Sequence, residues 1–267
     1  MTILRKREQR KGENGRVLTI GGSVDLIGAP AMAALAALRS GIDLSVVAAP
    51  EKVAYTINSY SPDLITKKFE GEFFNWDNVK DVIEFAENFH VIIIGNGLGL
   101  EPATFDFVKE IVERLPQPKV IDADAIKALR GAEFTNSVLT PHSKEFQILT
   151  DEILPEGLEK RTPIVKHFAG RDRVFLLKAP VDIITDGERV HYNKTGNDGM
   201  TIGGTGDVLA GITAGFIAQG GELFESAAAA AQLAGKIGDY LLKKKGYGFT
   251  ASDMIELIPE FRKKEKI

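Results

Sequence analysis

The chain of 267 residues has no cysteine, so disulfide bonds, thiolate metal ligands and cysteine nucleophiles are excluded. It also has no apolar stretch, free of glycine and charge, that is long enough to cross a bilayer. Residues 1–10 are charged and lack the apolar segment of a secretory signal peptide. These absences lead us to expect a cytoplasmic protein that does not associate with a membrane.

Charge of one sign is not in excess either. The formal net charge is −4 and the sequence pI is about 5.7, and the basic stretches at 5–11, 243–245 and 262–266 are short and close to the ends. Nothing in this balance favours nucleic acid as a partner. Hydrophobic residues make up 44% of the chain, and no linker or internal repeat divides it. We therefore expect one α/β domain over residues 1–267.

Short β-branched runs alternate with helical patterns along the first half of the chain, which is typical of parallel strands with helices on both faces. The apolar run at 91–94 predicts a central strand that is buried on both sides. The expected strands are 17–20, 44–48, 91–95, 120–122, 138–140, 174–177, 181–185 and 189–192. The expected helices are 29–40, 76–88, 102–115, 123–129, 143–149, 157–169, 207–219, 223–244 and 252–264.

A different pattern appears late in the chain. Two β-rich runs meet at Asp186-Gly187, a dipeptide that favours a tight hairpin turn. The sequence therefore predicts a doubly wound, mainly parallel sheet that ends in an antiparallel hairpin, followed by three helices.

The common nucleotide-binding motifs are missing. No P-loop occurs, and the glycines at 95, 97 and 99 do not have the spacing of a dinucleotide fingerprint. Instead, residues 193–211 (NKTGNDGMTIGGTGDVLAG) gather glycines at the start of an apolar helical pattern. A glycine-rich loop that opens a helix points backbone N–H groups at a phosphate. Asp207 would be repelled there unless it handles a proton or a metal ion, so the segment predicts a phosphate site with a catalytic acid.

Polar residues and glycines follow several of the predicted strands, where ligands of open parallel sheets bind. His142 directly follows one strand and a proline, whereas His90, His167 and His191 are interpreted as structural. Two interpretations stay open for Asp122 and Asp124, a metal site or the cap of a helix that begins near residue 125. Glu145, three residues after His142, fits the first turn of a helix.

These motifs, in this order, resemble the nucleotide-dependent NAD(P)H-hydrate dehydratases of the ribokinase-like superfamily. The resemblance runs from about residue 10 to 250. The matching segments are RKGENGRVLTIGGS (10–23), GAPAMAALAALRSG (28–41), VIIIGNGLG (91–99), VIDADAIKAL (120–129), LTPHSKEF (139–146) and NKTGNDGMTIGGTGDVLAGITAGFIAQG (193–220).

The resemblance implies a repair reaction on NADH or NADPH that has gained water across a double bond of the nicotinamide ring. The hydroxyl of the S form would be phosphorylated by ADP or ATP, and phosphate would then be eliminated. Mg²⁺ is expected with the phosphates. A separate epimerase would supply the S form, since an attached epimerase domain is not expected.

The resemblance also implies roles for particular residues. Asp207 would contact the hydrate and take its hydroxyl proton. Positions that match hydrate contacts are Ala29, Gly97 and His142. Positions that match adenine-nucleotide contacts or the anion site are Lys178, Ala179, Pro180, Val181, Asp182, Gly203, Gly204, Thr205 and Gly206.

The chain departs from the family pattern at three places. It has Ala179 where glycine is usual, Asp182 where threonine is frequent, and Leu26-Ile27 where a tyrosine is common. The choice between ADP and ATP therefore stays open.

Two other functions share the predicted anion site. One is a kinase of a small alcohol, such as a sugar or hydroxymethylpyrimidine, which would leave a stable phosphorylated product. The other is an adenylate-binding module without turnover, although a pure anion site gains nothing from Asp207. The relatives commonly form homo-oligomers, and the alanine-rich stretch 226–244 is a candidate interface.

Overall fold

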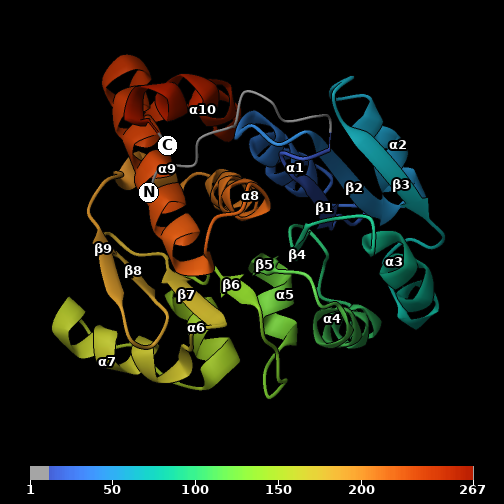
Figure 1. Cartoon of the computed structure of the whole chain (residues 1–267), viewed down its shortest axis with the longest axis horizontal. Coiled ribbons are helices and arrows are strands. Elements are labelled where there is room, and N and C mark those ends of the chain that lie inside the picture. Colours follow the sequence, from blue (N-terminus) through green and yellow to red (C-terminus); the bar gives the residue numbers. More distant parts are fainter. Residues whose placement is uncertain (1–11, 267) are drawn as a thin grey trace.

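The computed structural model describes residues 12–266, and the basic stretch at 5–11 lies outside them. Within this range nine strands form one sheet (Figure 1). Across the sheet the strands lie in the order β3 (Ile65–Phe69), β2 (Leu44–Pro50), β1 (Arg16–Ile20), β4 (Val91–Ile94), β5 (Lys119–Ile121), β6 (Ser137–Leu139), β7 (Arg173–Leu177), β8 (Asp182–Thr185) and β9 (Val190–Asn193).

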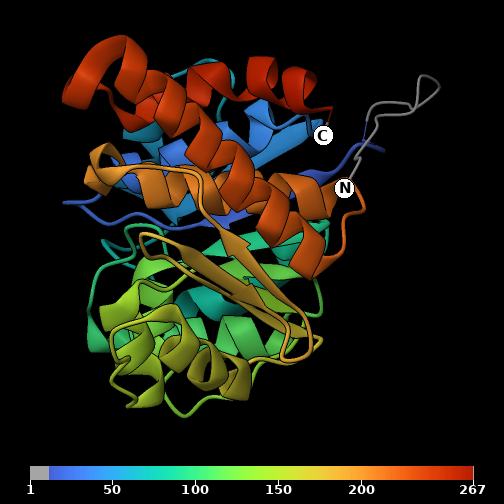
Figure 2. The same ribbon diagram turned by 90° about the vertical axis from the view of Figure 1, so that its left-hand side faces the viewer.

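Strands β1 to β7 are parallel to one another. Strand β8 pairs antiparallel with β7 on one side and with β9 on the other. The predicted hairpin is confirmed, with Thr185 opposite Val190 across the turn at Asp186-Gly187. Figure 2 shows this hairpin between the red C-terminal helices and the yellow-green helices. The strand order reverses between β1 and β4, so the switch point of the doubly wound sheet lies beside β4.

Helices cover both faces of the sheet, as the alternating pattern predicts (Figure 1). One face carries α1 (Gly28–Arg39), α2 (Glu51–Asn58), α8 (Thr205–Ala218), α9 (Leu223–Lys245) and α10 (Ala251–Glu265). The other carries α3 (Val79–Ala86), α4 (Pro102–Arg114), α5 (Ala123–Ala128), α6 (Ser143–Thr150) and α7 (Leu158–Phe168). The described residues also contain three short 3₁₀ helices: η1 (Trp76–Asn78), η2 (Asp198–Thr201) and η3 (Gly246–Gly248).

Strand β4 illustrates how the sequence builds two cores. Its four side chains are all buried. Because side chains alternate along a strand, Val91 and Ile93 belong to the core beneath α8, whereas Ile92 and Ile94 belong to the core that includes α3 and α4. A continuous apolar run is therefore what a strand covered on both faces requires.

The sequence patterns missed α2 and β3. Strand β3 (ITKKF) is an edge strand in which only Phe69 is buried, so it lacks the apolar run that marks the inner strands. Helix α2 is short and buries only Val53, Ala54 and Ile57. Most of the small residues of α9 are buried within the chain, so the suggested homo-oligomer interface stays a prediction. Among residues 12–266, no helix combines the length and the apolarity that a membrane span needs.

Helices α1 and α8 pack closely through glycine. A Cβ on Gly211 would lie 2.2 Å from the carbonyl oxygen of Ala33 and 2.7 Å from Cβ of Ala36. Both partners belong to α1, and one of them is backbone, so neither can move aside without moving the helix. This contact fixes α8 over the centre of the sheet.

We predict that Gly211→Ala destabilises the protein by about 1–3 kcal/mol, because overpacking outweighs the gain in helix propensity. Chemical denaturation would measure the change. The matched control is Gly248→Ala, where a Cβ meets nothing within 4 Å. An unchanged or higher stability of Gly211→Ala would show that the two helices can separate at no cost.

Candidate active site

The ends of four parallel strands and the start of α8 place polar side chains together. Asn96 follows β4, Asp122 follows β5, Thr140 follows β6 and Lys178 follows β7. Asp207 lies in the first turn of α8. All four strands end at the same edge of the sheet because they are parallel, so their polar neighbours meet there.

A hydrogen-bonded network joins these five side chains. Nδ2 of Asn96 donates to Asp207 Oδ1 (2.6 Å) and to Asp122 Oδ2 (3.1 Å). The other oxygen of Asp122 accepts from Thr140 Oγ1 (2.7 Å) and from Lys178 Nζ (3.0 Å). Asn96 is fully buried and Asp122 is 2% exposed, so one amide holds two carboxylates in a largely dry environment.

The environment of Asp207 makes its carboxyl unusually basic. Burial and then the negative charge of Asp122 raise its pKa to about 7, against the opposing hydrogen bond from Asn96 and the positive charge of Lys178. A group whose pKa lies near the working pH is suited to general acid–base catalysis. Within residues 12–266 its second oxygen, Oδ2, accepts no hydrogen bond from the protein.

Lys178 supplies the positive charge of the network. Burial lowers the pKa of its ammonium group, but the carboxylates of Asp122 and Glu145 raise it, and the net shift is upward. Lys178 is therefore charged at neutral pH. A Cβ on Gly206 would lie 3.4 Å from Lys178 Nζ, so the ammonium group lies against the first turn of α8.

The glycine-rich loop leads into the N-terminus of α8, as predicted. Gly204 is the N-cap at φ +96°, and a Cβ there would lie 2.7 Å from Sδ of Met32 and 2.7 Å from Cβ of Ala251. Gly203 is exposed, and a Cβ on it would meet nothing within 4 Å. The N–H groups of Thr205, Gly206 and Asp207 have no acceptor inside the helix. Together with Lys178 they form an electropositive site for an anion.

The remaining predicted nucleotide positions form the turn between β7 and β8. Asp182 closes this turn, because its Oδ1 accepts from the backbone N–H of Ala179 (3.0 Å). Its Oδ2 accepts from Nδ2 of Asn193 (2.9 Å). Pro180 is exposed and Val181 is half-buried. Asp182, which stands where the family often has threonine, is therefore hydrogen-bonded within the protein by Ala179 and Asn193. The nucleotide contacts of 178–182 stay a prediction.

The predicted hydrate contacts lie at the same edge. Gly97 adopts φ +68°, and a Cβ there would lie 3.3 Å from Cβ of Ala29, so these two positions are adjacent. His142 is the N-cap of α6, and its Nδ1 accepts from the backbone N–H of Glu145 (3.0 Å), while Glu145 Oε2 accepts from the N–H of His142 (2.9 Å). The structural interpretation of Glu145 is thus confirmed, and the contacts of Ala29, Gly97 and His142 with a substrate stay predictions.

Of the two interpretations of Asp122 and Asp124, the helix cap is wrong and the metal site stays a prediction. Neither side chain caps a helix: α5 begins at Ala123, and Asp122 at its N-cap accepts no capping hydrogen bond. Asp124 accepts from the N–H of Gly99 (3.0 Å) and pairs with Lys127 (2.7 Å). Asp122 belongs to the network, and Asp124 fixes the loop after β4.

Asn96 and Thr140 belong to the network but are not among the site residues that the sequence predicts. For Asn96 the available signal is its place directly after the buried run of β4, at the switch point of the sheet.

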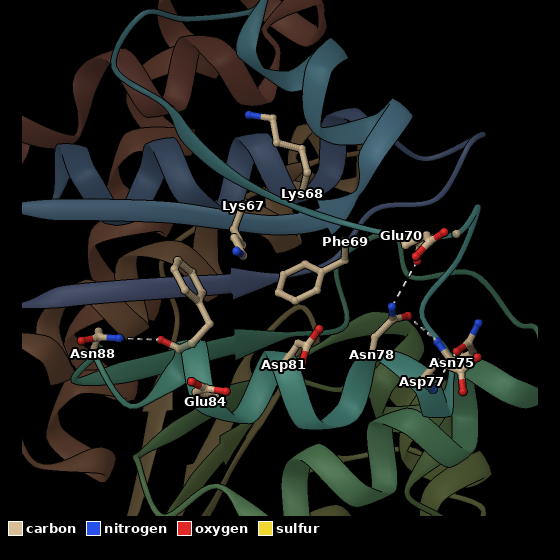
Figure 3. Close-up of a pocket in the computed structure, with 12 residues that line it drawn as sticks. Lys67, Lys68, Phe69, Glu70, Asn75, Asp77, Asn78, Asp81, Glu84 and Asn88 are labelled. Atoms are coloured by element: carbon tan, nitrogen blue, oxygen red, sulfur yellow. Dashed lines mark hydrogen bonds between the residues drawn. The ribbon is translucent and has the colours of Figure 1, made fainter.

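A groove of about 670 Å³ lies apart from this site, beside β3 and α3. Figure 3 shows it lined by Lys67, Phe69, Asp81 and Glu84. It contains none of the predicted site residues.

Comparison with known proteins identifies the family. A family model described as NAD(P)H-hydrate dehydratase matches residues 17–260. The chain belongs to this family.

Members of the dehydratase family match the chain along nearly its full length. An ADP-dependent (S)-NAD(P)H-hydrate dehydratase of Cenarchaeum symbiosum is 37% identical over 97% of this chain and 92% of its own. A bifunctional NAD(P)H-hydrate repair enzyme of Pyrobaculum aerophilum is 44% identical over 97% of this chain and 52% of its own. The chain therefore spans about half the length of the bifunctional relatives.

Solved structures agree. The ADP/ATP-dependent NAD(P)H-hydrate dehydratase of Bacillus subtilis, co-crystallised with ATP and Mg²⁺, is 27% identical, with a TM-score of 0.82 over 98% of this chain and 93% of its own. Ribokinase of Arabidopsis thaliana is 10% identical with a TM-score of 0.58 over 92% of this chain and 98% of its own, a likeness of fold alone. The predicted ribokinase-like fold is confirmed.

The donor set fits a magnesium ion that arrives with phosphates. Among residues 12–266 no group of three or more histidine and carboxylate side chains has the arrangement of a metal site. Mg²⁺ commonly uses one or two carboxylates together with substrate phosphates and water. The residues of the site therefore fit a metal that is held mainly by nucleotide phosphates and water rather than by a cage of protein ligands.

We predict that Asp207→Asn stabilises the protein, and increasingly so as the pH rises. The unfolded carboxyl ionises near pH 4, so below about pH 4 both states are protonated and the wild-type cost is absent. Between about pH 4 and the folded pKa of about 7, the unfolded state alone is ionised. The difference in unfolding free energy should therefore grow by a few kcal/mol and then level off.

Denaturant unfolding at several pH values would measure this trend. Asp186→Asn is the opposite control: burial raises the pKa of Asp186, but the hydrogen bonds from Arg189 lower it more. The stabilisation by its carboxylate is complete above about pH 4, so that variant should be less stable than the wild type by a nearly constant amount between about pH 4 and 7. A flat difference for Asp207→Asn would contradict the raised pKa.

Proposed function

We propose that this chain is a nucleotide-dependent dehydratase that converts the S form of NAD(P)H hydrate back to NAD(P)H, using ADP or ATP and releasing phosphate with AMP or ADP. The proposal rests mainly on one observation. A buried carboxyl, Asp207, with a pKa of about 7, lies beside unpaired N–H groups at the start of α8. A base and a phosphate site are thereby adjacent.

In the proposed first step Asp207 takes the proton of the hydrate hydroxyl. The hydroxyl oxygen attacks the terminal phosphorus of the nucleotide, and the phosphorus–oxygen bond to the leaving nucleotide breaks. The N–H groups of α8 and the ammonium group of Lys178 stabilise the negative charge on the transferring phosphate, which is the main requirement of phosphoryl transfer. A bound Mg²⁺ would neutralise further phosphate charge.

In the proposed second step the carbon–oxygen bond to the new phosphate breaks and phosphate leaves. A proton is lost from the neighbouring ring carbon, and the ring double bond is restored. The hydrogen bonds from Asn96 to Asp122 and Asp207, and from Lys178 to Asp122, would keep the two carboxylates in position for these steps. Because one epimer of the hydrate is accepted, an epimerase activity must supply it from the other.

The decisive experiment is incubation with chemically hydrated NADH and NADPH in the presence of Mg²⁺ and either ADP or ATP. We expect return of the near-ultraviolet absorbance of the reduced nicotinamide, together with release of free phosphate. A stable phosphorylated alcohol would instead indicate a small-molecule kinase. Ligand-induced stabilisation with no phosphate release would indicate an adenylate sensor.

We predict that Asp207→Asn lowers turnover by about 10²–10⁴-fold, the usual contribution of a positioned base, while nucleotide binding is retained. Wild-type turnover should rise with pH through an apparent pKa near 7, because the base must be ionised, and the variant should lack this limb. Steady-state kinetics from acidic to alkaline pH would test both points. Near-normal turnover in the variant would remove Asp207 from the mechanism.

A further inference from the structure

A second set of hydrogen bonds joins the glycine-rich loop to α9. None of the residues in this set is among the predicted site residues. Oδ2 of Asp239, on α9, accepts from the backbone N–H of Gly196 (3.1 Å). Its Oδ1 accepts from Nδ2 of Asn197 (3.0 Å). Oδ1 of Asn197 in turn accepts from the N–H of Gly199 (3.0 Å), at the start of η2. Two hydrogen bonds thus tie the loop to α9, and a third within the loop extends them to η2.

The shape of α9 allows the loop to come this close. A Cβ on Gly235 would lie 2.2 Å from Oγ1 of Thr195, and a Cβ on Gly238 would lie 2.3 Å from Sδ of Met200. On the loop side, a Cβ on Gly199 would lie 2.8 Å from the ring of Phe249. Gly235 and Gly238 therefore leave out the side chains that would otherwise separate the loop from α9, and Gly199 lets the loop approach Phe249.

The loop transmits this position to the anion site. Thr205 Oγ1 donates to the carbonyl oxygens of Met200 (2.7 Å) and Ile202 (3.1 Å). The first residue of α8 is therefore bonded to the segment that Asp239 and Asn197 fix. A displacement of residues 196–200 would move the N–H groups of α8 that face the phosphate.

The carboxylate of Asp239 is committed to these amide donors. No lysine, arginine or histidine pairs with it anywhere in the described part of the chain. An anionic acceptor bonds to N–H groups more strongly than a neutral one does. Because a carboxylate can only accept, Asn197 must turn its Nδ2 toward Asp239 and its Oδ1 toward the N–H of Gly199.

We propose that Asp239 is a positioning residue that, through Asn197, sets the geometry of the anion site for the transferred phosphate. This inference rests on the proposed function in naming the phosphate. It assigns to α9 an influence on nucleotide affinity that acts through the loop, because Asp239 itself touches no reacting atom.

The test exploits the direction of the hydrogen bonds. In Asp239→Asn an amide NH₂ faces either Nδ2 of Asn197 or the N–H of Gly196, so one bond becomes a donor–donor contact. In Asn197→Asp two carboxylates face each other. In the double variant Asp239→Asn/Asn197→Asp every donor again faces an acceptor. The new amide at 239 accepts from the N–H of Gly196 and donates to the new carboxylate at 197. That carboxylate also accepts from the N–H of Gly199.

We expect each single variant to weaken ADP binding about tenfold, the effect of one lost hydrogen bond, with an unchanged KM for the hydrate. The double variant should recover most of the wild-type affinity. Calorimetric titration with ADP gives the affinity independently of turnover, and thermal unfolding monitors stability. Asp186→Asn, which removes a buried carboxylate at the hairpin turn, should lower stability without changing ADP affinity.

Three results would overturn the positioning role: single variants that bind ADP like the wild type, a double variant no tighter than the single ones, or affinity losses that merely follow stability in every variant, Asp186→Asn included. Failure of the proposed function looks different. A wild type that binds ADP but does not restore NADH from its hydrate removes the dehydratase activity, while the affinity pattern still tests Asp239. A wild type that binds neither ADP nor ATP overturns both.

Discussion

The contact between the amide of Asn96 and the carboxylates of Asp122 and Asp207 is the interaction on which the site depends. Two carboxyl groups this close in a buried place repel each other, and one response is that one of them holds its proton more tightly. Asn96 limits that response by donating to both, and Lys178 offsets the charge of Asp122. The balance leaves Asp207 with a pKa near neutrality.

The fold supplies this contact from distant parts of the chain. Asn96 and Asp207 are 111 residues apart, and they meet because β4 ends at the switch point and α8 crosses the same edge. The position of α8 depends in turn on its contact with α1, where Gly211 removes the side chain that would separate the two helices. Packing on one face of the sheet therefore determines chemistry at its edge.

The sequence predicted the inner strands, the hairpin and the loop before α8 because each carries a local signal: the apolar run of β4, the Asp186-Gly187 turn and the glycines before Asp207. It did not predict β3 or α2, whose residues are only partly buried. The N–H groups at the start of α8 were predictable because the segment 193–211 contains both the glycine-rich loop and the helix start. The bond from Asn96 to Asp207 and that from Asp239 to Gly196 were not, since both join segments far apart in the chain and no local pattern pairs them.

The cap of α6 has a consequence for His142. Its Nδ1 accepts the N–H of Glu145, and a ring nitrogen that accepts a hydrogen bond carries no proton. The neutral imidazole must then hold its proton on Nε2. Its side chain is 51% exposed, and Nε2 lies 3.5 Å from Oε1 of Glu145, so the proton on Nε2 is close to the carboxylate of the same cap. A helix terminus thereby selects the tautomer of His142, and one glutamate orients both nitrogens of the ring.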